Sequence, residues 1–198
     1  MFGSDEFHGV ENPYASPLTP PTAPDPDVAE DAEEKSLRAF VGAKADYYLK
    51  KWAPLLRGAT GSAGYNWAAF FLSGLWLPYR KMYKLTVVLG GVVLLESIAE
   101  EVVFVGVLRQ QESPAALDRI VTLVIACICG ACGNSWYLAH ARKIIAEVES
   151  EGPDRETRFQ MIAKRGGTSF ASSLGFLILM LLLMFGVLFA LEIMFHLD

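Results

Sequence analysis

The feature that constrains this chain most is a long uncharged run near its C-terminal end. The run reads LGFLILMLLLMFGVLFAL and lies at the centre of residues 170–195. About 20 apolar residues in a helix are enough to cross the hydrocarbon core of a bilayer. Because every backbone polar group in lipid must be hydrogen-bonded internally, the run predicts a transmembrane α-helix.

Two further apolar stretches precede this run, at about residues 85–108 and 120–138. The composition agrees, since 53% of the 198 residues are hydrophobic and the mean hydropathy is +0.32, above what a soluble domain shows. We therefore predict an all-α fold: an integral membrane bundle of three transmembrane helices within a membrane domain at 65–198. A cytoplasmic loop at 142–165, with a short helix, would connect the last two spans.

A fourth apolar stretch, at residues 67–78, is too short to cross a bilayer alone. We predict an interfacial or re-entrant aromatic helix there. Its rings suit the headgroup level, where amphipathic aromatic side chains collect. These rings belong to Tyr65, Trp67, Trp76, Tyr79 and Tyr83.

The lysines and arginines set the expected orientation, because positive charge collects on the cytoplasmic side. With three spans and a cytoplasmic N-terminus, 15 of the 17 basic residues lie on that side, and only Arg109 and Arg119 lie outside. If 67–78 also crossed, this bias would collapse. We expect a multi-pass protein of a bacterial inner membrane, with its C-terminus outside.

The N-terminal region divides into an acidic tail and an amphipathic segment. Residues 1–34 hold nine Asp or Glu and six of the ten prolines, which predicts a disordered cytoplasmic tail. Residues 35–57 predict an amphipathic cytoplasmic helix, weakened at Gly42. This helix could lie on an anionic membrane surface or pack on the protein's own cytoplasmic parts. Its apolar face would hold Leu37, Val41, Tyr48 and Trp52.

Carboxylates inside the first predicted span form a candidate polar site. Glu96 and Glu100 lie four residues apart, on one helix face. A carboxylate at this depth usually faces a cavity or a partner, which suggests a proton or ion relay. Alternatively the span ends near Ala99, or the acids pair structurally. Arg119 could then bind Glu100 or Glu192 near the outer face.

The second predicted span carries small residues at helical spacing, which lets neighbouring helices approach closely. They form two stripes, Ala126–Gly130–Asn134 and Cys129–Gly133. We expect Asn134 to hydrogen-bond across helices. Because Cys127, Cys129 and Cys132 spread over more than one helix face, we predict no metal site and no cofactor. The chain contains no common catalytic motif, so we expect no enzymatic activity, and no nucleic-acid binding.

The aromatic stretch from Tyr65 to Tyr83 ends in a basic cluster of Arg80, Lys81 and Lys84. These side chains could hold anionic headgroups while the rings seat in the interface. One interpretation is an insertion anchor that fixes topology. The other is a docking site for a lipid or a membrane partner, made by Asn66, Trp67, Trp76, Tyr79, Arg80, Lys81 and Tyr83.

The sequence YNWAAFFLSGLWLPYRKMY, from Tyr65 to Tyr83, resembles the core of a bacterial family catalogued as domain of unknown function 2628. FVGAKADYYLKKW, GNSWYLAHARKI and RGGTSF are similar to other segments of that family. The resemblance covers about residues 40–170. It implies a small multi-span membrane protein and no established activity, so it brings no catalytic residue with it.

Two functions follow as expectations. The first is a scaffold, accessory subunit or regulator in the membrane, with a membrane-protein partner. The second is a small transporter or channel that uses Glu96 and Glu100. Since three spans rarely enclose a pathway alone, a transporter would be a homo-oligomer.

Overall fold

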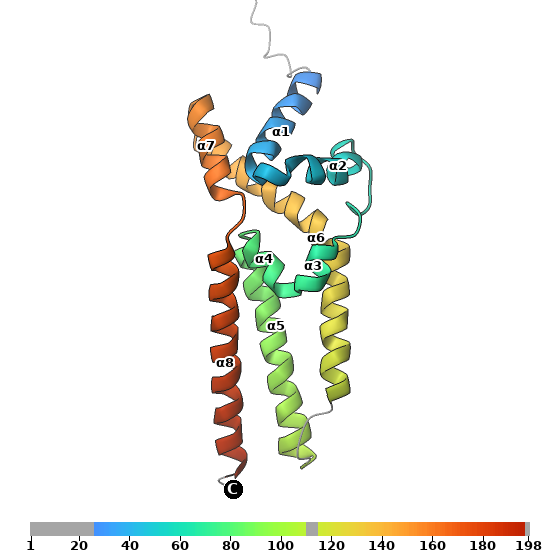
Figure 1. Ribbon diagram of the computed structural model, residues 1–198, viewed down its shortest axis with the longest axis vertical. Helices are drawn as coiled ribbons and strands as arrows, with labels where there is room; N and C mark the ends of the chain where they lie inside the picture. Colours follow the sequence, from blue (N-terminus) through green and yellow to red (C-terminus); the bar gives the residue numbers. More distant parts are fainter. Residues whose placement is uncertain (1–25, 110–114, 197–198) are drawn as a thin grey trace, which may run out of the picture.

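The chain folds into a compact head and a bundle of three long helices that extend from it (Figure 1). The computed structural model describes residues 26–109 and 115–196. Every regular element in these residues is helical, which confirms the all-α prediction. The head and the bundle meet at a joint of short helical pieces.

The head is built from three helices that pack around the C-terminal half of a fourth. These are α1 (Pro26–Val41), α2 (Ala45–Leu56), α7 (Arg155–Arg165) and the long α6 (Ala115–Ser150). The apolar faces of all four point inward, so they bury one core. Its members include Leu37, Phe40, Val41, Tyr48, Leu49, Trp52, Tyr137, Ala141, Ile145, Val148 and Ile162.

The predicted apolar face of residues 35–57 is therefore confirmed as a packing face. Leu37, Val41, Tyr48 and Trp52 are all buried in the head. Of the two alternatives, this segment packs on the protein's own helices. It is two helices rather than one, because the backbone at Gly42 adopts φ +72 and a 3₁₀ turn separates α1 from α2. That φ favours glycine.

The joint consists of α3 (Trp67–Leu72), a 3₁₀ turn (Ser73–Leu75) and α4 (Trp76–Tyr79). The predicted helix at 67–78 is thus interrupted in its middle, where Ser73 has φ +42. Trp76 and Leu77 are buried, whereas Trp67 and Phe71 are exposed. The two halves of the segment therefore have different surroundings.

The bundle contains α5 (Tyr83–Glu101), the N-terminal half of α6, and α8 (Phe170–His196). A π-helical turn (Val102–Val107) ends the α5 segment. Within residues 26–109 and 115–196, two helices are long and apolar enough to cross a membrane, one being α6 and the other lying in the stretch that contains α8. Ser169 caps α8 by accepting the Ser172 N–H at 3.2 Å, as its place after Gly166 and Gly167 predicts.

Two predicted boundaries differ from the structure. The acidic tail was placed at 1–34, but α1 already begins at Pro26, and residues 1–25 lie outside the described part. Proline suits the first position of a helix, and acids are favourable in its first turn. The loop at 142–165 is also wrong in part. α6 continues to Ser150, and only the short helix α7 matches.

Candidate functional site

A buried pair of asparagine amides ties the joint to α6. Asn66 Nδ2 donates to Asn134 Oδ1 at 2.9 Å, and Asn66 Oδ1 accepts the Ala69 N–H at the start of α3. Asn134 Nδ2 donates to the carbonyl oxygens of Ala63 and Gly64. Buried amides are costly without partners. Here the nitrogen and the oxygen of both amides form hydrogen bonds, so the pair stabilises one arrangement of the loop, α3 and α6. The predicted cross-helix bonding of Asn134 is confirmed.

Small residues on α6 allow this close approach. Any Cβ at Gly130 would overlap the Tyr65 ring, and one at Gly133 would lie 3.0 Å from the Ala69 Cβ. Ala126 and Cys129, from the same two stripes, are buried as well. The stripes therefore serve packing, as the sequence suggested.

The head's core is centred on Tyr137, which is fully buried. Its ring contacts those of Phe40, Tyr48, Trp52 and Trp76, with centroids 5.0–5.9 Å apart. Such tilted and edge contacts are favourable beyond the area they bury. Trp76, which we expected among lipid headgroups, is instead part of this protein core.

Arg80 also lies inside the protein, with 6% of its surface exposed. Its guanidinium donates to the Tyr48 hydroxyl at 2.9 Å and to the Tyr137 hydroxyl at 3.5 Å. It also lies over the rings of Tyr48, Tyr137 and Tyr79 at 4.8–5.5 Å. Aromatic faces stabilise a cation at these distances. The Arg80 guanidinium is therefore bound within the protein rather than displayed on its surface.

The remaining residues of the expected docking motif divide between interior and surface. Asn66 is buried and Tyr79 half-buried, whereas Trp67 and Tyr83 are exposed. Tyr83 reaches α8, where its hydroxyl lies 2.9 Å from Ser172 Oγ. The residues of the motif therefore do not form one surface. They connect the head, the joint and α8 instead.

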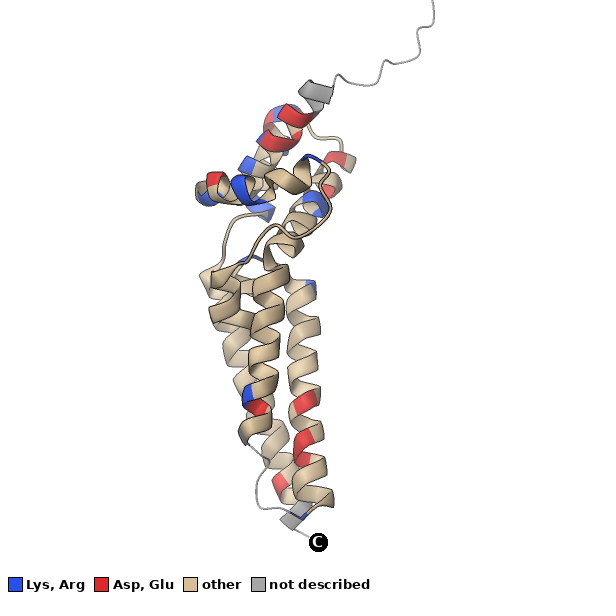
Figure 2. Ribbon diagram, turned by 90° about the vertical axis from the view of Figure 1, so that its right-hand side faces the viewer, with Lys and Arg blue, Asp and Glu red and all other residues tan. Residues whose placement is uncertain are grey.

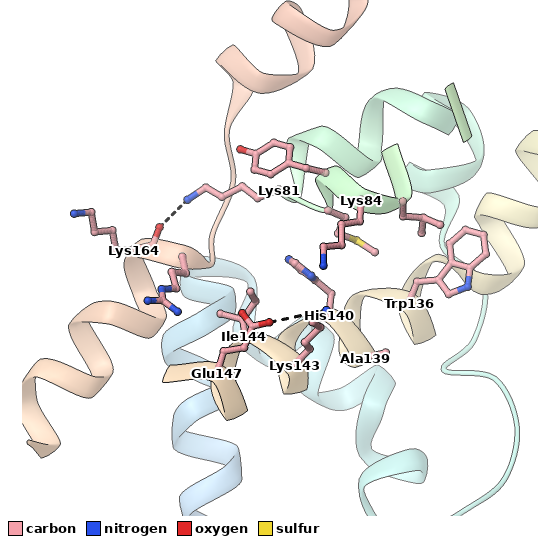
Figure 3. A pocket seen from close by; sticks show the side chains of 13 residues that line it. Lys81, Lys84, Trp136, Ala139, His140, Lys143, Ile144, Glu147 and Lys164 are labelled. Atoms are coloured by element: carbon pink, nitrogen blue, oxygen red, sulfur yellow. Dashed lines mark hydrogen bonds and ion pairs between the residues drawn. The ribbon is translucent and has the colours of Figure 1, made fainter. Parts of the chain in front are cut away.

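A basic pocket lies where the joint, α6 and α7 converge (Figure 3). The cavity measures about 740 Å³. Five cationic side chains line it against one described acid, Glu147. They are Lys81, Lys84, Lys143, Lys164 and Arg165. Residues such as Leu85 and Ile144 form its apolar walls, so the pocket combines positive charge with an apolar surface.

The pocket's cations are held in different ways. Lys81 Nζ donates to the Lys164 carbonyl at 3.0 Å, which closes the joint onto α7. Lys143 Nζ is 3.9 Å from Glu147 Oε1, a weak exposed pair.

His140 faces the same space, and burial lowers its pKa. No donor or acceptor of the described residues reaches its Nε2. Spacing along the chain does not predict that His140, Lys143 and Lys164 lie beside Lys81 and Lys84.

A second cluster lies in the bundle, away from the head. Carboxylate oxygens of Glu96, Glu100 and Asp118 lie within 4.8 Å of one another. Glu96 and Glu100 were predicted to share a face, but Asp118 on α6 was not expected beside them. Arg119 and Glu192, which we expected near the outer face, lie near the start of α6 and toward the end of α8.

The comparison with protein families gives one match. The model of the family described as "Protein of unknown function (DUF2628)" matches residues 37–143, just over half of the chain. These residues run from α1 through the joint to the pocket-lining part of α6, and they leave out RGGTSF at 165–170. No curated protein and no solved structure matches. The chain belongs to the DUF2628 family.

Proposed function

We propose that this chain is a small three-span protein of the bacterial inner membrane that acts without catalysis, as a scaffold, accessory subunit or regulator. We further propose that its pocket binds the anionic headgroup of a lipid. The observation that carries the proposal is the group of five cations lining a cavity where the head meets the apolar helices. Basic side chains attract anionic lipids when they lie at the membrane surface.

Charge distribution supports a cytoplasmic head. The described Lys and Arg gather in the head and the joint, while the bundle is almost uncharged over most of its length (Figure 2). Arg109 and Arg119 are the exceptions, near the far end of the bundle. On the positive-inside rule this distribution favours a head on the cytoplasmic side.

Support for a third span comes from α5. It has 19 residues and continues into the six-residue π-helical turn, so together the two are long enough to cross a bilayer. Exposed apolar side chains such as Val87 and Leu95 cover its length. It carries three glutamates toward its C-terminal end, Glu96, Glu100 and Glu101, whereas α8 carries one, Glu192.

Lipid binding can be tested by native mass spectrometry of the purified chain with phosphatidylglycerol or phosphatidylcholine added. We expect retention of phosphatidylglycerol and its loss in the double variant Lys84→Gln, Lys143→Gln. At about 1 kcal/mol per lysine near a charged surface, the affinity should fall roughly tenfold or more. Lys35→Gln, an exposed lysine on α1, is the matched control. Equal retention of both lipids by the unmodified chain would contradict the proposal.

An oligomeric transporter or channel is a second candidate, favoured by the meeting of Glu96, Glu100 and Asp118 between apolar helices. It predicts a homo-oligomer, whereas a scaffold predicts a heteromeric partner. Purification in mild detergent with mass determination separates the two. A stable monomer that retains no partner would contradict both.

A further inference from the structure

The acidic cluster differs from an ordinary set of surface carboxylates. Glu100 is 7% exposed, and Glu96 is half-buried. Among the described residues no hydrogen-bond donor reaches Glu96 Oε1 or Glu100 Oε1, and both atoms are inaccessible. One carboxylate oxygen of each glutamate lies within 4.8 Å of an Asp118 carboxylate oxygen. A buried anionic oxygen without a partner is costly, and three neighbouring carboxylates repel one another.

We propose that Glu96, Glu100 and Asp118 bind one hard divalent cation, of which Ca²⁺ is the best fit, and that the ion fastens α5 to α6. Oxygens bound to Ca²⁺ lie 2.3–2.6 Å from it, so two oxygens on opposite sides of the ion are about 4.6–5.2 Å apart. The three ligand atoms lie within 4.8 Å of one another. One ion can therefore contact all three.

The chemistry of the donors selects the class of cation. All three ligands are carboxylates, which suit Ca²⁺, Mg²⁺ and Mn²⁺, whereas zinc and copper prefer imidazole and thiolate. Mg²⁺ demands near-ideal octahedral geometry, whereas Ca²⁺ accepts irregular sets of oxygen ligands. Asp118 is exposed, so water can reach the ion and complete the six to eight ligands that Ca²⁺ takes.

The position of the cluster explains what the ion would do. Glu96 and Glu100 lie on α5, and Asp118 lies near the start of α6. Acidic residues appear toward the end of the bundle that lies away from the head (Figure 2). An ion here would hold the two helices together far from the amide pair and the aromatic core. This inference does not depend on lipid binding in the basic pocket.

The experiment is a calorimetric titration of CaCl₂ into the full chain, purified in detergent and freed of metal by a chelator. We expect one Ca²⁺ per chain and a rise in melting temperature of about 3 °C or more at saturation. NaCl at matched ionic strength should give neither effect. Absence of a Ca²⁺ signal in the folded chain, or an equal effect of NaCl, would overturn the proposal.

Neutral substitutions sharpen the test. Glu100→Gln and Asp118→Asn should each weaken Ca²⁺ binding at least tenfold, while Glu101→Gln, beside the cluster but outside it, should bind as the unmodified chain does. In chelator, Glu100→Gln should melt higher than the unmodified chain because the repulsion is relieved. If Ca²⁺ binding survives in Glu100→Gln, or disappears equally in Glu101→Gln, the assigned site is wrong.

Discussion

The head and the bundle of this protein differ in how far they bury their apolar side chains. In the head, Phe40, Trp52 and Tyr137 are fully buried. In the bundle, Leu182 and Phe185 of α8 are 66% and 74% exposed. None of the most apolar window of the stretch containing α8 is buried by protein.

This difference separates two sources of stability. The head carries its own core and gains from removing apolar surface from water, as a soluble domain does. The bundle leaves most of its apolar surface uncovered by protein, so contacts between its own helices bury little of that surface. Matched substitutions in the two regions should therefore have very different effects on the folded chain in detergent.

The largest difference is expected for aromatic truncation. Tyr137→Ala would leave a cavity among four aromatic rings and should lower the free energy of unfolding by about 3–5 kcal/mol. Phe185→Ala, on the exposed face of α8, should change it by less than about 1 kcal/mol. Chemical unfolding in detergent, followed by tryptophan fluorescence, measures both. Similar losses at the two positions would show that detergent-exposed and buried rings are equivalent here.

Glycine substitutions extend the comparison to the link between head and bundle. A Cβ at Gly166 would overlap the carbonyl oxygen of Phe40, so Gly166→Ala should destabilise by about 1–3 kcal/mol. Nothing lies within 4 Å of a Cβ at Gly186 in α8, and Gly186→Ala should be neutral or stabilising by up to about 1 kcal/mol. Thermal unfolding of both variants measures these changes. A Gly166→Ala chain of unchanged stability would show that the backbone around Phe40 and Gly166 shifts at little cost.

Arg80 tests whether the joint belongs to the head or to the membrane surface. Arg80→Lys keeps the charge but loses the planar contact with Tyr48 and Tyr137, so unfolding should become easier by about 1.5 kcal/mol. Insertion, followed with a reporter fused after Asp198, should be unchanged. Normal stability with defective insertion would instead support the topology-anchor interpretation.

The smallest effect concerns pH and is confined to the head. Burial lowers the pKa of His140, with Lys143 acting in the same direction and Glu147 opposing it. The unfolded chain therefore binds a proton more readily than the folded one. Stability should fall as pH drops below about 6.5, the ordinary pKa of histidine. Melting curves at pH 7.5 and 5.5 should show a smaller difference in His140→Gln than in the unmodified chain.

Local patterns predicted much of the fold. Helical periodicity identified the buried face containing Leu37 and Trp52, and Gly42 marked the weak point at which the segment divides into two helices. Hydropathy misplaced the end of α6, because a helix continues past the point where its side chains stop being apolar. It reaches Ser150 because the apolar face of its amphipathic C-terminal half packs against α1 and α7.

The site was harder to predict, because its residues come from distant segments. Arg80 is 32 residues from Tyr48 and 57 from Tyr137, and spacing in the sequence does not reveal such contacts. The basic cluster of Arg80, Lys81 and Lys84 therefore suggested a headgroup contact for Arg80 and did not reveal its place among the aromatic rings. Asp118 was missed beside Glu96 and Glu100 for the same reason.

The course of α6 has a mechanical consequence. Asp118 lies near one end of its 36 residues, and the pocket-lining residues His140 and Lys143 lie toward the other. The helix bends where it passes from the bundle into the head (Figure 1). Midway along it, the carbonyl oxygens of Gly130 and Asn134 accept the Asn66 N–H and the Trp52 indole N–H from outside the helix, and such contacts and glycines are common causes of helix bends. The joint is therefore fastened to the middle of α6, and a change in the angle between the two halves of this helix moves the head relative to the bundle.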